Sequence, residues 1–233
     1  MTRQPIRVLL VDDHAIVREG YRALIEKHEG LQVVAEAANA ASAYQCYKQA
    51  RPDVVVMDIS MPGRGGIDAI EHIRRLDFKA RILVFTMHDG PAYALQAFRA
   101  GAKGYVTKSS PPDILVAAVR DVAEGRRVIC PEMSSVLALD RVREERTAVD
   151  DLSPREFEIF RMILATKTTD EIAAALNISR KTAGNYHYSI KSKLGAASDI
   201  ELLYLGLRHG LIGPVLSASE PVESAITDTL ANR

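Results

Sequence analysis

Five short runs of mainly aliphatic and β-branched residues alternate with helical patterns through the first half of the chain. Four of these runs are almost continuously apolar, which is typical of parallel strands that are covered on both faces. The five predicted strands are Arg7–Val11, Leu31–Ala37, Asp53–Asp58, Arg81–Thr86 and Lys103–Thr107. The helical patterns between and after them lie at about 14–28, 40–50, 65–76, 90–101 and 111–124. These βα repeats predict an open, doubly wound α/β sheet, in which functional residues gather at the carboxyl ends of the strands.

Composition restricts the class of protein further. The chain has 233 residues, of which 47% are apolar and 26% are charged, and its 30 basic side chains balance its 30 acidic ones. These values are typical of a globular protein of one or two domains, and they exclude a disordered or disulfide-dense chain. No apolar run approaches the roughly 20 residues of a membrane span, and the first residues do not resemble a secretory signal. Because Cys46 and Cys130 are expected to be reduced, we predict a cytoplasmic protein.

Polar residues stand at the predicted strand ends. Asp12 and Asp13 follow the first strand, and Asp58 ends the third. Three carboxylates in one crevice repel each other, and a hard cation such as Mg²⁺, which prefers oxygen ligands, would relieve that repulsion. Thr86 ends the fourth strand and Lys108 follows the fifth, and a hydroxyl and an ammonium suit a transferred phosphoryl group. The set therefore indicates an aspartyl phosphate, although the same residues are also compatible with ordinary turns at strand ends.

Four segments carry a resemblance to a known family. Val11–His14, Val56–Gly63, Phe85–Thr86 and Gly104–Lys108 resemble the receiver domain of bacterial two-component response regulators, and the match extends over residues 6–125. The resemblance implies a flavodoxin-like fold. It also implies a phosphoprotein that takes its phosphoryl group from a sensor histidine kinase.

The same resemblance implies roles for individual residues. Asp58 would be the phosphoacceptor. The implied Mg²⁺ ligands are Asp12, Asp13, Asp58 and the backbone carbonyl of Ser60. Lys108 would contact the phosphoryl group, and Thr86 would close on it. Tyr105 would move between an outward and a buried position as Thr86 moves; the alternative for this residue is a strand tyrosine that packs on the sheet.

Three details of the sequence modify this picture. Ser109 follows Lys108, where many receivers have a proline, so a cis prolyl bond is not available at that position. Ser60 and His88 each stand two residues beyond a predicted site residue, and we expect them to influence the lifetime of the phosphoryl group. Neither His14 nor His88 belongs to a Cys/His spacing pattern, so neither is expected to bind a metal ion.

The second half of the chain has a different organisation. Residues 151–213 show four helical patterns. The first follows a capping box from Ser153 to Glu156, and the others span about Thr169–Leu176, Arg180–Leu194 and Asp199–His209. Two short helices joined by a tight turn, the second of them basic, predict a helix-turn-helix. We therefore expect a receiver domain at 1–130, a charged linker at 131–150, an all-α helix-turn-helix domain at 151–213 and a flexible tail at 214–233.

A second resemblance covers the helix-turn-helix region. The segments that carry it are Leu152–Glu156, Asp170–Ala173, Leu176–Ser179, Thr182 and Lys193–Gly195. They resemble the LuxR-type DNA-binding domain of the NarL/FixJ family of response regulators, and within that family the chain is most similar to the GacA/UvrY group. The resemblance implies sequence-specific binding of double-stranded DNA and regulation of transcription.

The predicted DNA contacts lie on and beside the second helix of the motif. They are Arg180, Lys181, Thr182, Gly184, Asn185, Tyr188, Lys191 and Lys193. Asn185 is expected to read adenine, and the lysines are expected to contact phosphates. The usual Thr-Val-Lys of the family reads Thr182-Ala183-Gly184 here, so a lysine that often touches DNA is missing. The alternative is that residues 184–188 only pack on their own domain and do not contact DNA.

One small helix-turn-helix gives limited contact with DNA, so we predict a homodimer when the chain is phosphorylated. Leu202, Tyr204 and Leu205 of the last helix are the candidate dimer residues, although the two leucines are equally compatible with the core. We predict a regulator rather than an enzyme, because Ser60 stands where a phosphotransferase with an aspartyl intermediate usually has a second Asp. The alternative function is a DNA-binding regulator with a vestigial receiver that does not depend on phosphorylation.

Overall fold

The computed structural model describes residues 4–61, 65–131, 133–135 and 148–212. Most of the predicted linker and the whole predicted tail lie outside these residues. The first half forms a parallel sheet with the strand order β2-β1-β3-β4-β5-β6, which confirms the predicted doubly wound α/β fold. The strands are β1 (Ile6–Val11), β2 (Leu31–Ala37), β3 (Val54–Met57), β4 (Ile82–Thr86), β5 (Gly104–Thr107) and β6 (Val128–Ile129). The two-residue strand β6, which pairs with β5, was not predicted.

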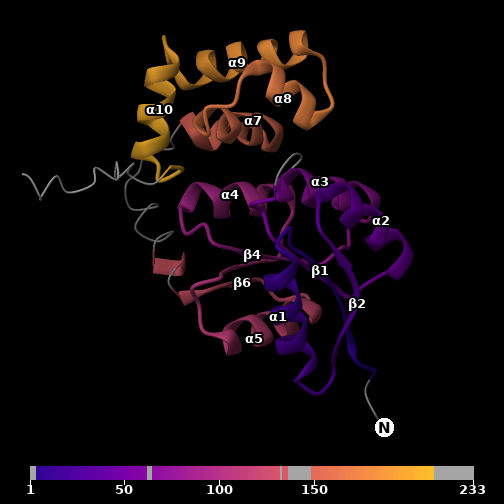
Figure 1. Ribbon diagram of the computed structural model, residues 1–233. Helices are drawn as coiled ribbons and strands as arrows, with labels where there is room; N and C mark the ends of the chain where they lie inside the picture. The colour runs from indigo at the N-terminus through magenta and orange to yellow at the C-terminus, as the bar shows by residue number, and fades with distance from the viewer. Residues whose placement is uncertain (1–3, 62–64, 132, 136–147, 213–233) are drawn as a thin grey trace, which may run out of the picture.

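Helices cover both faces of the sheet. Figure 1 shows α1 and α5 on one face and α2, α3 and α4 on the other. The helices are α1 (Ala15–Glu26), α2 (Ala40–Ala50), α3 (Gly66–Leu76), α4 (Pro91–Ala100) and α5 (Pro112–Ala123). Every residue of β3 and of β4 is buried, as the continuous apolar runs predicted.

The start of α3 lies against the end of β3. A Cβ atom on Gly66, the first residue of α3, would lie 2.2 Å from the carbonyl oxygen of Asp58. Only glycine fits at such a distance, because even a methyl group would overlap the backbone. This close approach holds the first turn of α3 against the backbone of Asp58, at the carboxyl edge of the sheet.

The second half is a helical domain. It contains a 3-10 helix η1 (Ala148–Asp151) and the helices α7 (Pro154–Leu164), α8 (Thr169–Leu176), α9 (Arg180–Leu194) and α10 (Asp199–Arg208). The predicted capping box is present, because Ser153 Oγ accepts from the Glu156 N–H and the Glu156 carboxylate accepts from the Ser153 N–H. Gly195 ends α9 in the left-handed conformation, with φ of 67°. The predicted helix-turn-helix is therefore confirmed as α8 and α9.

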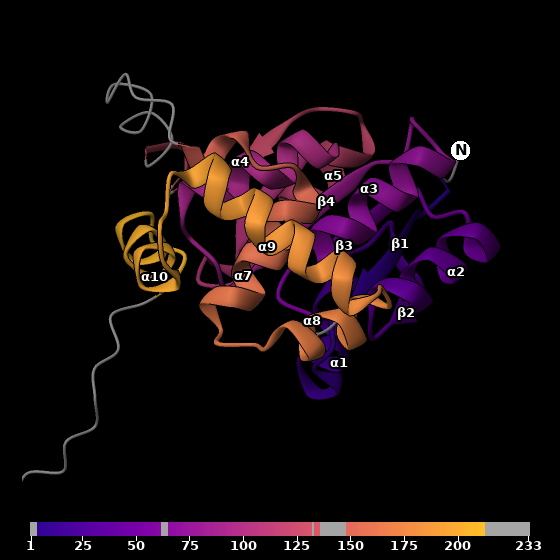
Figure 2. The same ribbon diagram turned by 90° about the horizontal axis from the view of Figure 1, so that it is seen from above.

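The two domains are in contact through one side of the helical domain. Helix α7 packs on α3 and α4, and α9 lies on the opposite side, away from the sheet (Figures 1 and 2). Gln96 of α4 donates to the carbonyl of Leu152 at 3.0 Å, and the Tyr93 hydroxyl donates to the carbonyl of Leu211 at 3.2 Å. The sheet domain therefore leaves α9 uncovered. Among the described residues, no helix is long and apolar enough to cross a membrane.

Candidate functional site

The structure brings the predicted acidic residues together at the carboxyl edge of the sheet. Asp12 follows β1 and Asp58 follows β3, and each is 2% exposed. Lys108, which follows β5, donates from Nζ to Asp12 Oδ2 and to Asp58 Oδ2, both at 2.6 Å. The backbone N–H of Ser60 donates to the other oxygen of Asp58, Oδ1, at 2.8 Å. One buried ammonium thus bridges two buried carboxylates.

The surroundings of Asp58 and Lys108 keep both groups charged. Burial alone would raise the pKa of Asp58, but the hydrogen bonds from Lys108 and from the Ser60 N–H outweigh it, so the pKa lies below its ordinary value. Burial would likewise lower the pKa of Lys108, but the two carboxylates outweigh it and raise that pKa. Asp58 is therefore an ionised carboxylate at neutral pH, which a nucleophile requires.

The acidic edge fits a divalent cation. Asp13 is half-buried, and its Oδ1 accepts no hydrogen bond among the described residues. Ligand atoms of Asp12, Asp13 and His14 lie within 4.8 Å of one another. Carboxylate oxygens with an unsatisfied lone pair are the donors that Mg²⁺ prefers. The imidazole of His14 also faces this group, with Nδ1 at 3.0 Å from Asp13 Oδ1, although its sequence context had not indicated a ligand.

Thr86 ends β4 and Tyr105 lies on the neighbouring strand β5, at the same edge of the sheet as Asp58. Thr86 is fully buried, and its Oγ1 lies 3.1 Å from Ser60 Oγ. Tyr105 is fully buried as well, and its hydroxyl donates to the carbonyl of His88 at 2.9 Å. Burial raises the pKa of this phenol well above its ordinary value, so it remains a donor. Of the two positions expected for Tyr105, the structure therefore has the buried one.

The ring of His88 packs on Tyr93, a residue that itself contacts the helical domain. It stacks on Tyr93 of α4, with the ring centroids 3.9 Å apart and the planes 6° from parallel. Burial and the nearby guanidinium of Arg161 lower the pKa of His88 to about 4, so the ring is neutral at physiological pH. The structure thus gives His88 a place in the domain contact, and its expected influence on the phosphoryl lifetime stays a prediction.

The predicted DNA contacts divide into exposed side chains and side chains engaged within the domain. Lys181, Thr182 and Asn185 are exposed, Tyr188 is 77% exposed, and the space around the half-buried Gly184 is open. Three basic residues are in ion pairs: Arg180 with Asp170 at 3.3 Å, Lys191 with Asp199 at 3.3 Å, and Lys193 with Glu156 at 2.7 Å. Lys193 in particular binds the carboxylate of the α7 capping box, which gives it a structural role that the sequence did not indicate.

The candidate dimer residues of α10 also differ in burial. Leu202 is fully buried, so it belongs to the core of the helical domain, which is the alternative that the sequence left open. Leu205 is partly buried against the same core. Tyr204 is 71% exposed, and Ile200 and Leu207 on the same helix are also exposed. The apolar surface of α10 is therefore formed by Ile200, Tyr204 and Leu207.

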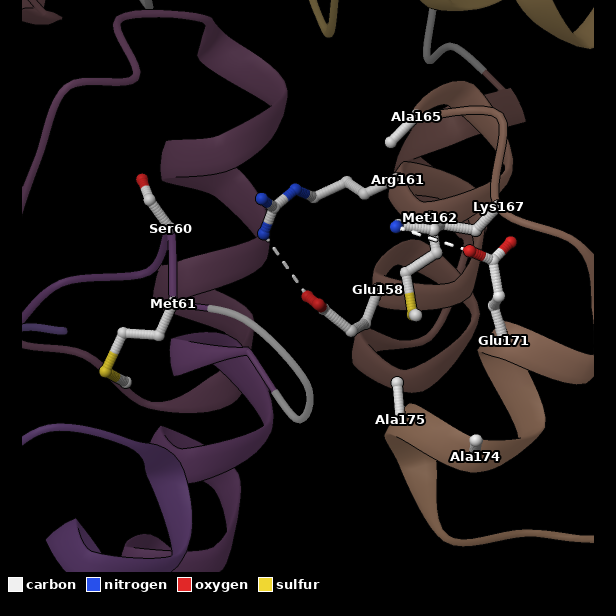
Figure 3. A pocket seen from close by; sticks show the side chains of 10 residues that line it. All are labelled: Ser60, Met61, Glu158, Arg161, Met162, Ala165, Lys167, Glu171, Ala174 and Ala175. Carbon is white, nitrogen blue, oxygen red and sulfur yellow. Dashed lines mark hydrogen bonds and ion pairs between the residues drawn. The ribbon is translucent and has the colours of Figure 1, made fainter.

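Sequence reasoning missed two polar residues of α7 that reach the sheet domain. Arg161 donates to the carbonyl of Ile59, the residue directly after Asp58, at 3.1 Å. Glu158 is 3% exposed, packs against Gly65 and forms an ion pair with Arg161 (Figure 3). On an amphipathic helix, residues of this kind are normally read as a solvated face. Their burial depends on the other domain, and no local pattern signals it.

Comparisons with known proteins agree with this geometry. The family described as "Response regulator receiver domain" matches residues 8–120, and "Bacterial regulatory proteins, luxR family" matches residues 150–205. Response regulator UvrY of Escherichia coli K12 is 39% identical over 208 residues, which are 88% of this chain and 95% of UvrY. Response regulator GacA of Pseudomonas aeruginosa is 36% identical over 209 residues, which are 89% of this chain and 98% of GacA.

A solved structure is also similar over most of the chain. RcsB from Salmonella enterica serovar Typhimurium, bound to the promoter P1flhDC in the presence of the phosphomimetic BeF3-, has a TM-score of 0.68 and 29% identity, covering 86% of this chain and 98% of RcsB. The sheet with its acidic edge and the helix-turn-helix thus define a receiver joined to a DNA-binding domain. The chain belongs to the NarL/FixJ family of two-component response regulators and is a transcription factor of that family.

Proposed function

We propose that Asp58 is the phosphoacceptor of this regulator. The observation that carries the proposal is the contact of Lys108 with both Asp12 and Asp58, which places an ammonium beside an ionised, buried carboxylate. A carboxylate oxygen of Asp58 attacks the phosphorus of a phosphohistidine on the sensor kinase. The O–P bond forms, the N–P bond breaks, and the histidine leaves with its electron pair.

The groups around Asp58 suit the charge that develops in this step. Lys108 and the Ser60 N–H already donate to the carboxylate, and the Thr86 hydroxyl lies next to Ser60. These donors are in place before the phosphoryl group arrives, so they stabilise its oxygens without reorganisation. Asp12, Asp13, Asp58 and the carbonyl of Ser60 would hold Mg²⁺, which supplies neutralisation of the phosphoryl charge when bound.

We infer that α9 is the recognition helix and that α10 forms the dimer contact. Lys181, Asn185 and Tyr188 project from the uncovered side of α9, where they suit phosphate and base contacts in the major groove. The exposed Ile200, Tyr204 and Leu207 lie along α10 at positions that share one face. Two copies joined there would bind two half-sites. A receiver domain at 1–130, a helical domain that includes η1 (Ala148–Asp151) and extends to about residue 213, and a cytoplasmic location complete the proposal.

Capture of sheared genomic DNA on the purified protein tests both halves of the proposal. The protein is prepared with and without Mg²⁺ and beryllofluoride, and the bound fragments are sequenced. We expect a discrete set of fragments that is enriched only with the phosphoryl mimic. The Asp58→Ala variant is the matched control, and it should give no enrichment. Equal enrichment in all samples would favour the alternative function, a DNA-binding regulator with a vestigial receiver.

A direct assay of Asp58 tests the remaining alternative, an enzyme with an aspartyl intermediate. The protein is incubated with acetyl phosphate and Mg²⁺ and its intact mass is measured. One phosphoryl adduct is expected on the wild type and none on Asp58→Ala. Continuous turnover of small phosphate esters would instead indicate a phosphatase or phosphotransferase.

A further inference from the structure

Two side chains of the DNA-binding domain hold the loop that follows the phosphoacceptor. Arg161 donates from Nη1 to the carbonyl of Ile59 at 3.1 Å. Glu158 forms an ion pair with Arg161 at 3.4 Å, and its carboxylate packs directly against the backbone at Gly65. The pair of Glu158 and Arg161, here named the α7 clamp, thus contacts Ile59, directly after Asp58, and Gly65, directly before α3; Figure 3 shows the pair itself.

The α7 clamp is a close contact rather than a loose one. A Cβ atom on Gly65 would lie 2.5 Å from Glu158 Oε2, so the carboxylate packs directly on the loop backbone. Next to it a cavity of about 440 Å³ separates Ser60 and Met61 from residues of α7 and α8, including Met162 and Ala175 (Figure 3). Glu158 and Arg161 line the same cavity, so on this side α7 meets Ile59 and Gly65 through the polar contacts of the α7 clamp.

The same side of the DNA-binding domain also supports the residue that holds Tyr105. The Arg161 guanidinium lies 5.5 Å from the centre of the Tyr93 ring, and Phe157 packs edge-on against that ring at 5.4 Å. Tyr93 in turn stacks on His88, whose carbonyl accepts the Tyr105 hydroxyl. The contact between the two domains therefore extends, through Tyr93, to His88, whose carbonyl holds Tyr105 in its buried position.

A continuous set of hydrogen bonds leads from there back to Asp58. The N–H of His88 donates to Thr86 Oγ1 at 3.4 Å, Thr86 Oγ1 lies 3.1 Å from Ser60 Oγ, and the Ser60 N–H donates to Asp58. The groups that would receive a phosphoryl group are thus held in place from two directions, through Ile59 and through His88. Donors fixed before an anion arrives stabilise it more than donors that must first be ordered.

We propose that Arg161 and Glu158 are positioning residues for the phosphorylation site, and that a phosphoryl group on Asp58 strengthens the docking of the DNA-binding domain instead of releasing it. The inference rests on the proposed function of Asp58. Coupling between two sites is reciprocal, so a contact that favours the phosphoryl group must itself be favoured by it. Helix α9 lies on the far side of the domain, so this docking leaves the recognition helix free.

The test compares the affinity for beryllofluoride and the lifetime of the phosphoryl group in full-length variants. Arg161→Met removes the bond to Ile59, and Arg161→Lys retains a donor and should restore part of the effect. Lys167→Met is the matched control, because Lys167 borders the same cavity but pairs with Glu171 at 3.6 Å. Fluorine NMR gives the beryllofluoride affinity in the presence of Mg²⁺, and circular dichroism shows that each variant is folded.

We expect Arg161→Met to bind beryllofluoride about five- to tenfold more weakly than the wild type, at the lower end of ordinary coupling between two sites, and to lose its phosphoryl group faster. Lys167→Met should behave as the wild type. Gly65→Ala tests the contact from the receiver side, where the new methyl group displaces Glu158, and its effect should not simply add to that of Arg161→Met, because Glu158 and Arg161 are paired with each other.

The outcomes separate this proposal from the proposed function. If the wild type takes up neither beryllofluoride nor a phosphoryl group, the assignment of Asp58 fails and the clamp proposal fails with it. If the wild type binds beryllofluoride and Arg161→Met binds it equally or more tightly, Asp58 stands and the positioning role is refuted. Tighter binding in that variant would show that docking opposes phosphorylation, which is the release mechanism.

Discussion

Replacement of Lys108 by methionine should destabilise the receiver through the two acids that it leaves behind. The Lys108 side chain is 7% exposed, and the side chains of Asp12 and Asp58 are 3% and 2% exposed. Methionine has a similar length but no charge, so two carboxylates remain buried without their shared cation. Removing one partner of a buried ion pair costs about 3–5 kcal/mol, and we expect about 3 kcal/mol at pH 7, because backbone N–H groups still donate to both acids.

The pH dependence of this loss follows from the same contacts. In the wild type the pKa of Asp58 is lowered, so its contribution to stability is present above the ordinary pKa of an aspartate and is lost as the pH falls through the lower, folded value. In Lys108→Met the bond that lowers this pKa is absent, and burial raises it. The folded variant then binds a proton more readily than the unfolded chain, so its deficit should shrink as the pH falls from 7 to 5.

Urea unfolding followed by circular dichroism measures both effects. The wild type, Lys108→Met and the control Lys27→Met, whose lysine is exposed at the end of α1, are compared with and without Mg²⁺. Mg²⁺ should stabilise Lys108→Met more than the wild type, because the cation replaces the missing positive charge. A deficit below about 0.5 kcal/mol at pH 7, within the range of ordinary surface substitutions, or a deficit that grows toward pH 5, would refute the reasoning.

Three further predictions concern single positions. His88→Gln should flatten the fall in stability below pH 6.5, because the unfolded chain takes up a proton that the native His88, with a pKa of about 4, does not. The full shift corresponds to about 3 kcal/mol, and partial exposure of the ring reduces this to about 2 kcal/mol, which urea unfolding near pH 4 should measure. Gly184→Ala should stabilise α9 by about 1 kcal/mol, since open space surrounds Gly184, and a simultaneous loss of DNA affinity in a gel-shift assay would show that the DNA backbone approaches there. Gly66→Ala should cost about 2 kcal/mol or more in unfolding experiments and slow phosphorylation by acetyl phosphate, because the new methyl group would overlap the Asp58 carbonyl.

Much of the sheet domain follows from local pattern. The buried parallel strands produce continuous apolar runs, and their order along the chain places Asp12, Asp58 and Lys108 at one edge. Strand β6 was missed because Val128–Ile129 is too short to show any periodicity. The helices of the second domain were predicted to within one residue where a side-chain cap marks the start, as at Ser153 and Ser179.

Contacts between distant segments account for what the sequence could not indicate. On α10, Leu202 and Tyr204 are both compatible with an apolar face, and only the packing of the domain decides that the first is core and the second exposed. The burial of Glu158 requires the loop of another domain, and the stack of His88 on Tyr93 requires a particular path of the chain after β4. A helical wheel or a strand pattern contains no information on either contact.

The bond from Arg161 to the carbonyl of Ile59 has a consequence for how such regulators can be recombined. Receivers and DNA-binding domains are often treated as interchangeable parts joined by a linker. Here the output domain reaches the backbone one residue from Asp58, so the boundary that matters runs between α7 and Ile59. A chimera that joins this receiver to another output domain should keep its response to the kinase only if Glu158 and Arg161 travel with it. Selection for altered kinase response should likewise recover substitutions in α7.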